Sequence, residues 1–439
     1  MKLLWCAVGA IIPFLSVNAL IPENKQQSIQ QPGSGIAGHE KLDDVISASP
    51  LLSLHRAICE VESISHNELA VGKLVVSILE AHNFTVKTQG VPQPEETNST
   101  KPRYNIYAYP DPSKYSGIEL GSIPSPKVVL SSHIDTVPPH IPYSLSLPAA
   151  AAKSAKTRED ILISGRGTVD DKACVAVQIQ TLLDLLADPE TKLDPSDVAL
   201  LFVVGEETHG DGMRRFSASD LYEQTNANYK AILFGEPTEG KLATGHKGIS
   251  MVKIKAHGKA AHSGYPWLGR SANSMILPAL VALDGLGDIP EDVGGLPRSG
   301  KYGKSTVNVG LMQGGVAGNV VAEYAEASIT FRLAGGDADE VKELVTEAVR
   351  RVDPDRLLEL DFAQGYGPVE LDGDDVDGFD TITVNYGTDI PNLKVAEGVK
   401  RYLYGPGSIL VAHGENEGLT VGDLEEALDG YKTLLLRSL

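Results

Sequence analysis

Histidine and acidic side chains that follow apolar stretches are the residues best placed to do chemistry in this chain. His133 and Asp135 come directly after 127–130, a β-branched apolar run typical of a buried strand. Side chains two residues apart on a strand point to the same face. The imidazole could bind a metal through one nitrogen while a nearby carboxylate holds the other. Most His-x-Asp triplets have no such role, so this pair carries weight only with companions.

The first companions are two pairs of adjacent carboxylates. The stretch G-R-G-T-V-D-D-K at 165–172 places Asp170 and Asp171 just before a predicted helix. A helix N-cap accounts for one aspartate there, because a cap accepts hydrogen bonds from first-turn amides, but it does not account for the whole pattern. In V-V-G-E-E-T, Glu206 and Glu207 follow a buried strand. Two carboxylates at such a place are costly unless a cation or a proton compensates them.

Two later stretches complete the set. F-G-E-P-T puts a glutamate at another strand end, and V-A-H-G-E-N-E puts a histidine near the end of the chain. Ligands of α/β sheets gather at the carboxyl ends of the strands, so these distant side chains can converge. Two imidazoles and three carboxylates suit a pair of zinc ions that share one carboxylate. The predicted ligands are His133, Asp170, Glu207, Glu236 and His413. Glu206 would remain as a general base for amide hydrolysis.

The predicted elements place these stretches on an α/β fold. Apolar runs predict strands at 105–109, 127–130, 198–204 and 230–234, and helical periodicity predicts helices at 68–81 and 171–186. The connection 139–160 has no clear pattern and is predicted to be an exposed excursion. Strands that alternate with helices indicate a mostly parallel sheet.

After residue 245 the pattern changes to strands with alternating apolar residues. Strands are predicted at 249–256, 306–312 and 325–333, and helices at 271–286 and 338–352. These three strands and two helices make a compact α+β unit. A further helix is predicted near the end of the chain, at 421–436. We therefore predict a catalytic domain in two parts, 41–245 and 368–439, with a lid or dimerisation domain inserted at 246–367. No internal repeat is evident.

Length and composition limit the functional classes. The chain has 439 residues, which is too long for one small core, and its composition of 42% apolar and 22% charged residues is that of a globular protein. The net charge of −20 argues against a nucleic-acid binder, which would need a basic face.

The first residues predict a secreted protein. Lys2 is followed by an almost wholly apolar stretch to Val17, and V-N-A supplies small residues for cleavage. Residues 1–19 therefore read as a signal peptide, with a membrane anchor as the alternative. Residues 20–40 are rich in Gln, Gly and Pro and predict a flexible leader or a removed pro-segment.

Cysteine and asparagine motifs add to this prediction. Cleavage would leave Cys59 and Cys174, which excludes a disulfide scaffold and leaves one bridge open. Sequons at Asn83 and Asn98 predict N-glycosylation of a secreted chain, although such short motifs also arise by chance.

Five motifs together resemble a known family. S-S-H-I-D-T-V-P, G-R-G-T-V-D-D-K, V-G-E-E, F-G-E-P-T and the late His413 occur in the order and approximate spacing of the co-catalytic zinc peptidases. That family includes acetylornithine deacetylase, succinyl-diaminopimelate desuccinylase, aminoacylase-1 and glutamate carboxypeptidase relatives. The resemblance runs from about residue 42 to the end. Each motif alone is unspecific, whereas five in order are highly specific.

The resemblance implies a role for each matched residue. His133, Asp170 and Glu236 would hold one metal, and Asp170, Glu207 and His413 the other. Asp135 would orient His133, and Glu206 would be the general base. A glutamate at position 236 resembles the deacetylase and desuccinylase branch, whereas dipeptidases have an aspartate there.

The inserted region also resembles the family. In G-K-A-A-H-S, His262 would stabilise the oxyanion, commonly in the partner subunit's site, and the alternative is a surface histidine at a strand end. By resemblance Asn319 and Arg332 would bind the substrate carboxylate, because a guanidinium can bind both of its oxygens. Arg332 could equally make a structural salt bridge. Lys247 stands where some relatives have arginine, which leaves the exact carboxylate contact open.

These observations predict a secreted, zinc-dependent, carboxypeptidase-like metallopeptidase with two Zn²⁺ per subunit. It would hydrolyse an amide next to a free carboxylate in a small peptide, and it would form a homodimer through the inserted domain. Neither nucleic acid nor, after signal cleavage, a membrane is expected as a partner. One alternative is an N-acyl-amino-acid deacylase or deacetylase. Another is an inactive binding protein on the same fold, although every predicted ligand and the base glutamate are present.

Overall fold

The computed structural model describes residues 42–95, 97, 99–117, 121–147 and 157–439. The predicted signal peptide, the leader and Asn98 lie outside these residues. The chain forms two compact units. Unit 1 comprises Met1–Gly212, Glu223–Asn228 and Pro406–Leu439, and unit 2 comprises Met213–Tyr222 and Tyr229–Gly405. The predicted α/β class with mostly parallel sheet pairing is confirmed.

The sheet of unit 1 is built on two wholly buried strands. β3 (Val128–His133) and β6 (Val198–Val203) pair in parallel, and every residue of both is buried. Their apolar runs fit burial on both faces. β2 (Arg103–Pro110) pairs antiparallel with β6, and β1 (Phe84–Val91) pairs antiparallel with β2, so the order is β1-β2-β6-β3. β1 was not predicted, because its middle residues are polar and partly exposed.

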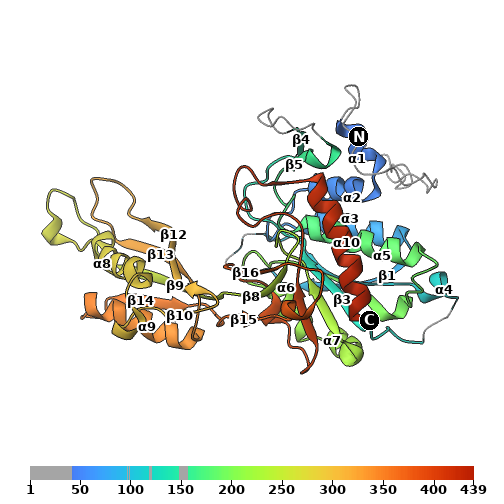
Figure 1. Cartoon of the computed structure of the whole chain (residues 1–439). Helices are drawn as coiled ribbons and strands as arrows, with labels where there is room; N and C mark the ends of the chain where they lie inside the picture. The colour runs from blue at the N-terminus through green and yellow to red at the C-terminus, as the bar shows by residue number, and fades with distance from the viewer. Residues whose placement is uncertain (1–41, 96, 98, 118–120, 148–156) are drawn as a thin grey trace, which may run out of the picture. The chain divides into compact units, whose positions relative to one another are not determined.

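Helices cover this sheet in unit 1 (Figure 1). α5 (Lys172–Ala187) packs against α10 (Val421–Ser438), α2 (Pro50–Cys59) and β3, and it is buried along most of its length. Its short apolar residues fit a helix that is covered on several sides. α10 begins with a capping box in which Thr420 and Asp423 satisfy each other's backbone amides. The remaining elements are α1 (Leu42–Ala48), α3 (Leu69–Ala81), α4 (Pro112–Tyr115), β4 (Ser144–Ser146), β5 (Leu162–Ser164) and β18 (Gly418–Thr420).

The connection that was predicted to be an exposed excursion contains part of a small sheet. β4 and β18 both pair antiparallel with β5. β5 leads directly into the 165–171 loop, and β18 follows the stretch that carries His413. This small sheet therefore joins two of the predicted metal-binding stretches, although they are far apart in the sequence. No disulfide joins Cys59 and Cys174, which are both buried.

Unit 2 contains the α+β region predicted from alternating residues. β9 (Gly248–His257), β12 (Thr306–Gly314), β13 (Tyr324–Leu333) and β14 (Leu358–Phe362) form an antiparallel sheet in the order β12-β13-β9-β14. α8 (Ala272–Asp284) and α9 (Ala338–Val352) pack on it (Figure 1). The other strands are β7 (Ala231–Phe234), β8 (Leu242–His246), β10 (Arg298–Ser299), β11 (Gly303–Lys304), β15 (Val369–Glu370), β16 (Thr381–Val384) and β17 (Lys400–Leu403). The helices α6 (Asp211–Ser217) and α7 (Asp220–Thr225) each contain residues assigned to both units. Because unit 2 extends beyond the α+β region, the limits 246 and 367 stay a prediction.

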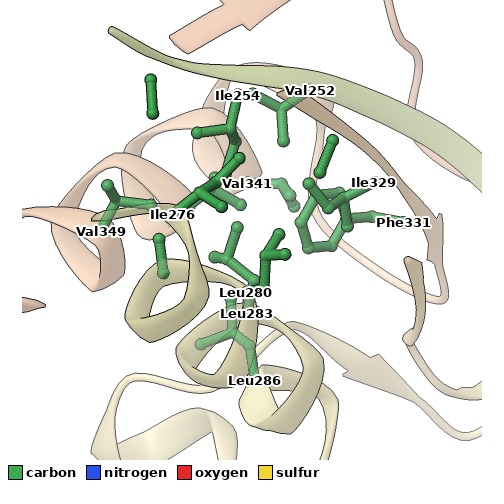
Figure 2. Packing of buried hydrophobic residues seen from close by; sticks show 14 of the residues in the cluster. Val252, Ile254, Ile276, Leu280, Leu283, Leu286, Ile329, Phe331, Val341 and Val349 are labelled. Carbon is green, nitrogen blue, oxygen red and sulfur yellow. The ribbon is translucent and has the colours of Figure 1, made fainter. Parts of the chain in front are cut away.

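One apolar core holds this α+β region together (Figure 2). Alternate residues of β9 and β13, including Ile254, Ile329 and Phe331, face α8 and α9. Each buried large apolar side chain contributes about 1.5–3 kcal/mol relative to exposure. α9 presents Val341 and Val349 to the core and keeps a charged outer face. Across both units, no helix in the described part of the chain is apolar over a stretch long enough to cross a membrane.

Candidate metal centre

Two histidines and two carboxylates of unit 1 lie in direct contact. His133 ends β3, and its Nε2 lies 3.0 Å from Oδ1 of Asp170. Oδ2 of Asp170 lies 3.2 Å from Nε2 of His413, which is also 3.0 Å from Oε2 of Glu207. Asp170 thus faces both imidazoles through different oxygens, as a bridging carboxylate would. The structure brings together four of the five predicted ligands within this unit.

Strand pairing explains why these side chains meet. In the parallel β3–β6 ladder, His133 is opposite Val203, so the carboxyl ends of the two strands are adjacent. Glu206 and Glu207 follow after Gly205, which has φ +74°. A side chain at Gly205 would also clash with the carboxylate of Asp211. Both the positive φ and this close approach therefore require glycine at position 205. His413 likewise has a positive φ of 63°, a conformation that is uncommon for residues other than glycine.

The charges of this cluster are strongly coupled. Burial opposes ionisation of Asp170, but hydrogen bonds with His133 and His413 hold its pKa below the usual range. Burial, with the charge of Asp170, raises the pKa of Glu207 to about 7. Hydrogen bonds to Asp170 and Glu207 raise the pKa of His413 to about 10. These shifts show that the imidazoles and carboxylates of the cluster interact strongly with one another.

The donor set fits a metal ion. Oε1 of Glu207 is buried and has no hydrogen-bond partner. Among the described residues, no lysine or arginine forms an ion pair with Asp170 or Glu207. One ligand atom from each of His133, Asp170 and Glu207 lies within 4.8 Å of the others. Carboxylate oxygens and imidazole nitrogens are the ligands that zinc takes in catalytic sites. A cation here would satisfy the unpaired oxygen of Glu207 and add positive charge beside the two carboxylates.

Asp135 contacts both His133 and the turn that carries Glu206 and Glu207. Its carboxylate is fully buried and lies 3.6 Å from Nδ1 of His133, while that Nδ1 lies 3.0 Å from the Asp135 carbonyl oxygen. The carboxylate also accepts hydrogen bonds from the backbone amides of Glu206 (3.2 Å) and Glu207 (3.3 Å) and from the Ser65 hydroxyl (2.8 Å). The geometry therefore gives Asp135 a wider function than sequence reasoning expected, because it holds the Glu206–Glu207 turn as well as facing His133.

Arginine and acidic residues behind this turn were missed by sequence reasoning. The Arg103 guanidinium is buried, forms an ion pair with Asp211, and lies 3.6 Å from a carboxylate oxygen of Glu68. Burial raises the pKa of Glu68 to about 7, and the charge of Asp135 adds to this. These residues lie in unremarkable stretches of sequence, so no local signal could have identified them.

The fifth predicted ligand belongs to unit 2. Glu236 follows β7 by two residues and is buried. The next residue, Pro237, accepts a hydrogen bond through its carbonyl oxygen from the Tyr386 hydroxyl at 3.0 Å. The participation of Glu236 in the metal centre stays a prediction.

Lys247 and Arg332 lie at one end of the four-stranded β12-β13-β9-β14 sheet. Arg332 pairs with Ile249 across the β9–β13 ladder, one residue from the end of β13. Arg332 forms no ion pair with any described residue, so the structure does not contain the salt bridge considered as its alternative. Lys247 is buried, burial lowers its pKa, and its ammonium donates to the Lys304 carbonyl at 2.7 Å. Arg332 is thus the more available of the two cations.

His262 and Asn319 lie beyond the opposite end of the same strands. The amide of Ser263 donates to the Asn319 carbonyl at 3.0 Å, and His262 bridges to Val320. Arg332 lies eight positions beyond Tyr324 along β13, which amounts to about 26 Å at 3.3 Å per residue. One chain therefore cannot place Asn319 and Arg332 on the same carboxylate, and their predicted joint contact requires two copies.

The ring of His262 is exposed and already oriented. The amide of Gly264 donates to its Nδ1 at 3.0 Å. A neutral ring that accepts at Nδ1 carries its proton on Nε2, so it can donate a hydrogen bond there. This arrangement suits the predicted oxyanion contact.

Comparison with known proteins decides the family. Residues 244–356 match the family described as "Peptidase dimerisation domain". A protein of Uncinocarpus reesii named "Probable carboxypeptidase" is 48% identical over 99% of this chain and 98% of its own length. A relative from Aspergillus niger with the same description is 53% identical over 89% of this chain and 90% of its own. The chain belongs to the M20 family of metallopeptidases. The family resemblance drawn from the motifs is thereby confirmed.

Solved structures of M20 proteins share the fold. The dipeptidase Dug1p of Saccharomyces cerevisiae has a TM-score of 0.68 at 14% identity, over 90% of this chain and 97% of that one. The M20 metallo-carboxypeptidase Sso-CP2 of Sulfolobus solfataricus has a TM-score of 0.58 at 15% identity, over 89% and 99%. This M20 chain is accordingly a metal-dependent peptidase.

Proposed function

We propose that this M20 peptidase is a secreted dinuclear zinc carboxypeptidase that cleaves an amide next to a free carboxylate. The observation that carries the proposal is the contact of His133, Asp170, Glu207 and His413, with an unpaired buried oxygen at Glu207. The printed names of the similar fungal proteins support the carboxypeptidase assignment.

The metal ligands follow from the donor set. Asp170 would bridge, because its two oxygens already face different imidazoles. His133 and Glu236 would complete one site, and Glu207 and His413 the other. When bound, two zinc ions would polarise the scissile carbonyl and lower the pKa of an attacking water.

The protein's own groups would then move the proton and hold the substrate. Glu206 is the acidic side chain next to the ligand Glu207, and Asp135 holds its backbone amide, so its carboxylate would take the proton from water and deliver it to the leaving amine. Arg332 would bind the terminal carboxylate of the substrate. His262 of a second copy would donate from Nε2 to the developing oxyanion.

Replacing Asp135 by Asn should lower kcat by about 10–100-fold and weaken metal binding. An asparagine can still accept one hydrogen bond, but its NH₂ group opposes one of the two amides that the carboxylate now receives. Metal content by mass spectrometry and steady-state kinetics measure both effects. Unchanged kcat together with unchanged zinc content would contradict the positioning assigned to Asp135.

The second copy would dock on the outer face of α8 and the edge strand β12. Leu277 and Val281 are four residues apart on α8 and are 47% and 74% exposed, while Leu311 and Met312 of β12 are 53% and 50% exposed. α8 and β12 contact each other, so exposed apolar side chains of both elements lie in the same part of the α+β region. An edge strand can pair with another copy through its free backbone groups.

We therefore expect Val281→Asp to convert the dimer to a monomer, because a buried unpaired charge disfavours an apolar interface. Light scattering after gel filtration measures the mass. The matched control is Leu436→Asp, an exposed leucine of α10 in unit 1, which should stay dimeric. The monomer should lose most activity if His262 acts on a partner's site; a fully active monomer would refute that exchange.

One experiment tests the proposed reaction. Dipeptides with varied C-terminal residues and N-acetyl-amino acids are compared as substrates, with and without a chelator. Cleavage of dipeptides that stops on chelation and returns with zinc supports the proposal. Preference for N-acetyl-amino acids would assign a deacylase instead. Absence of bound zinc and of all hydrolysis would favour a binding protein on the same fold.

Secretion rests on the amino-terminal sequence alone. Sequencing of protein collected from the medium of an expressing eukaryotic culture should find a start at or after Leu20. Asn83 is exposed in the turn between α3 and β1 and is accessible to a glycan. Retention of all the protein in the cell with its first residues intact would refute this part of the proposal.

A further inference from the structure

We infer that Glu417 is a positioning residue that sets two metal ligands at once, an inference that rests on the proposed metal centre. Its side chain is 1% exposed, and it immediately precedes β18. Oε1 accepts hydrogen bonds from three amides of the loop that ends at a ligand: Gly167 at 2.8 Å, Val169 at 3.2 Å and Asp170 at 3.3 Å. One carboxylate oxygen thus holds the backbone that leads to Asp170.

The other carboxylate oxygen extends the arrangement to the second ligand. Oε2 accepts from Nη1 of Arg166 at 2.5 Å, and Arg166 is 2% exposed. Nη2 of Arg166 donates to the backbone carbonyl of His413 at 3.3 Å. Glu417 is therefore connected to Asp170 directly and to His413 through the guanidinium. It is also only four residues from His413 along the chain.

The chemistry of these contacts requires an anion. Three amides and a guanidinium present only donors, and a carboxylate accepts from all of them. A glutamine of the same shape would turn an NH₂ group toward donors and leave the buried Arg166 charge unpaired. Glycines with positive φ at positions 165 and 167 let the loop curve around the carboxylate. The loop is thus shaped around this one side chain.

The placement of Glu417 is distinct from that of a ligand. It contacts the ligands through their backbone, and its side chain is fully engaged by Arg166 and the amides. Its effect on catalysis would be exerted through the positions of Asp170 and His413. Loss of such a supporting group typically costs about 10–100-fold in metal affinity or activity.

The test compares Glu417→Gln with wild type and with Glu415→Gln, a matched control at an exposed glutamate two residues earlier. Zinc affinity is measured by competition with a chromophoric chelator, kinetics by kcat and KM separately, and stability by thermal unfolding of the metal-free proteins. We expect Glu417→Gln to lose about 10–100-fold in zinc affinity and in kcat, with KM within about threefold. The control should match wild type throughout.

Two results would overturn the inference. One is unchanged zinc affinity and kcat in Glu417→Gln. The other is a lower unfolding temperature while the folded variant keeps wild-type affinity and kcat, which would show a purely structural role. If Glu417→Gln does not fold, Glu417→Asp carries the same test, because it keeps the charge but is one methylene too short to reach all its donors. A wild type without zinc or activity would instead refute the proposed function.

Discussion

The Glu206→Gln variant should lose about 10²–10⁴-fold in kcat while it keeps its full complement of bound metal. Glutamine has the shape of glutamate but cannot take a proton from water near neutral pH. The backbone amide of residue 206 would still donate to Asp135, so the turn and the neighbouring ligand Glu207 should stay in place. The loss should therefore fall on the chemical step.

Kinetics and metal analysis of the same preparation measure this separation. The matched control is Glu80→Gln, an exposed glutamate of α3 in the same unit, which should behave as wild type. Wild-type kcat in Glu206→Gln would rule out its role as the base. Loss of metal together with activity would instead indicate that Glu206 is a ligand.

Asp170→Asn should differ from Glu206→Gln because it should lose bound metal as well as activity. We expect fewer than one zinc per chain and a fall in kcat of at least about 10³-fold, because about 4 kcal/mol of metal-derived stabilisation corresponds to that factor. An asparagine has one acceptor oxygen and no charge, so it cannot serve both imidazole-bearing sites. In the structure, the two oxygens of Asp170 face His133 and His413 separately.

Elemental analysis and kinetics check this outcome. Asp429→Asn on the exposed face of α10 controls for the loss of one carboxylate from unit 1. Retention of two zinc ions per chain in Asp170→Asn would show that Asp170 is not the bridging ligand. Taken together, the Glu206 and Asp170 variants separate the base from the bridge, since only the first should retain its metal.

The elements that carry the site could be predicted because they rest on local patterns. The apolar runs of β3 and β6 and the helical periodicity of α5 are visible within a few residues of sequence. The alternation in β9 and β13 identified the α+β region for the same reason. β1 escaped prediction, since its pairing with β2 and not its own polarity pattern makes it a strand.

The candidate site divides in a similar way. By itself the sequence determined which side chains could bind metal. Acidic side chains at the ends of buried strands are energetically costly unless a cation or a proton compensates their charge, and histidines at such places can share the cation. The tertiary structure alone decided what holds them. Glu417 and Arg166 are 251 residues apart, and Asp135 receives amides 71 and 72 residues away. Such partners leave no periodic trace in the chain, because a hydrogen bond between distant residues depends on strand order and loop path, not on local spacing.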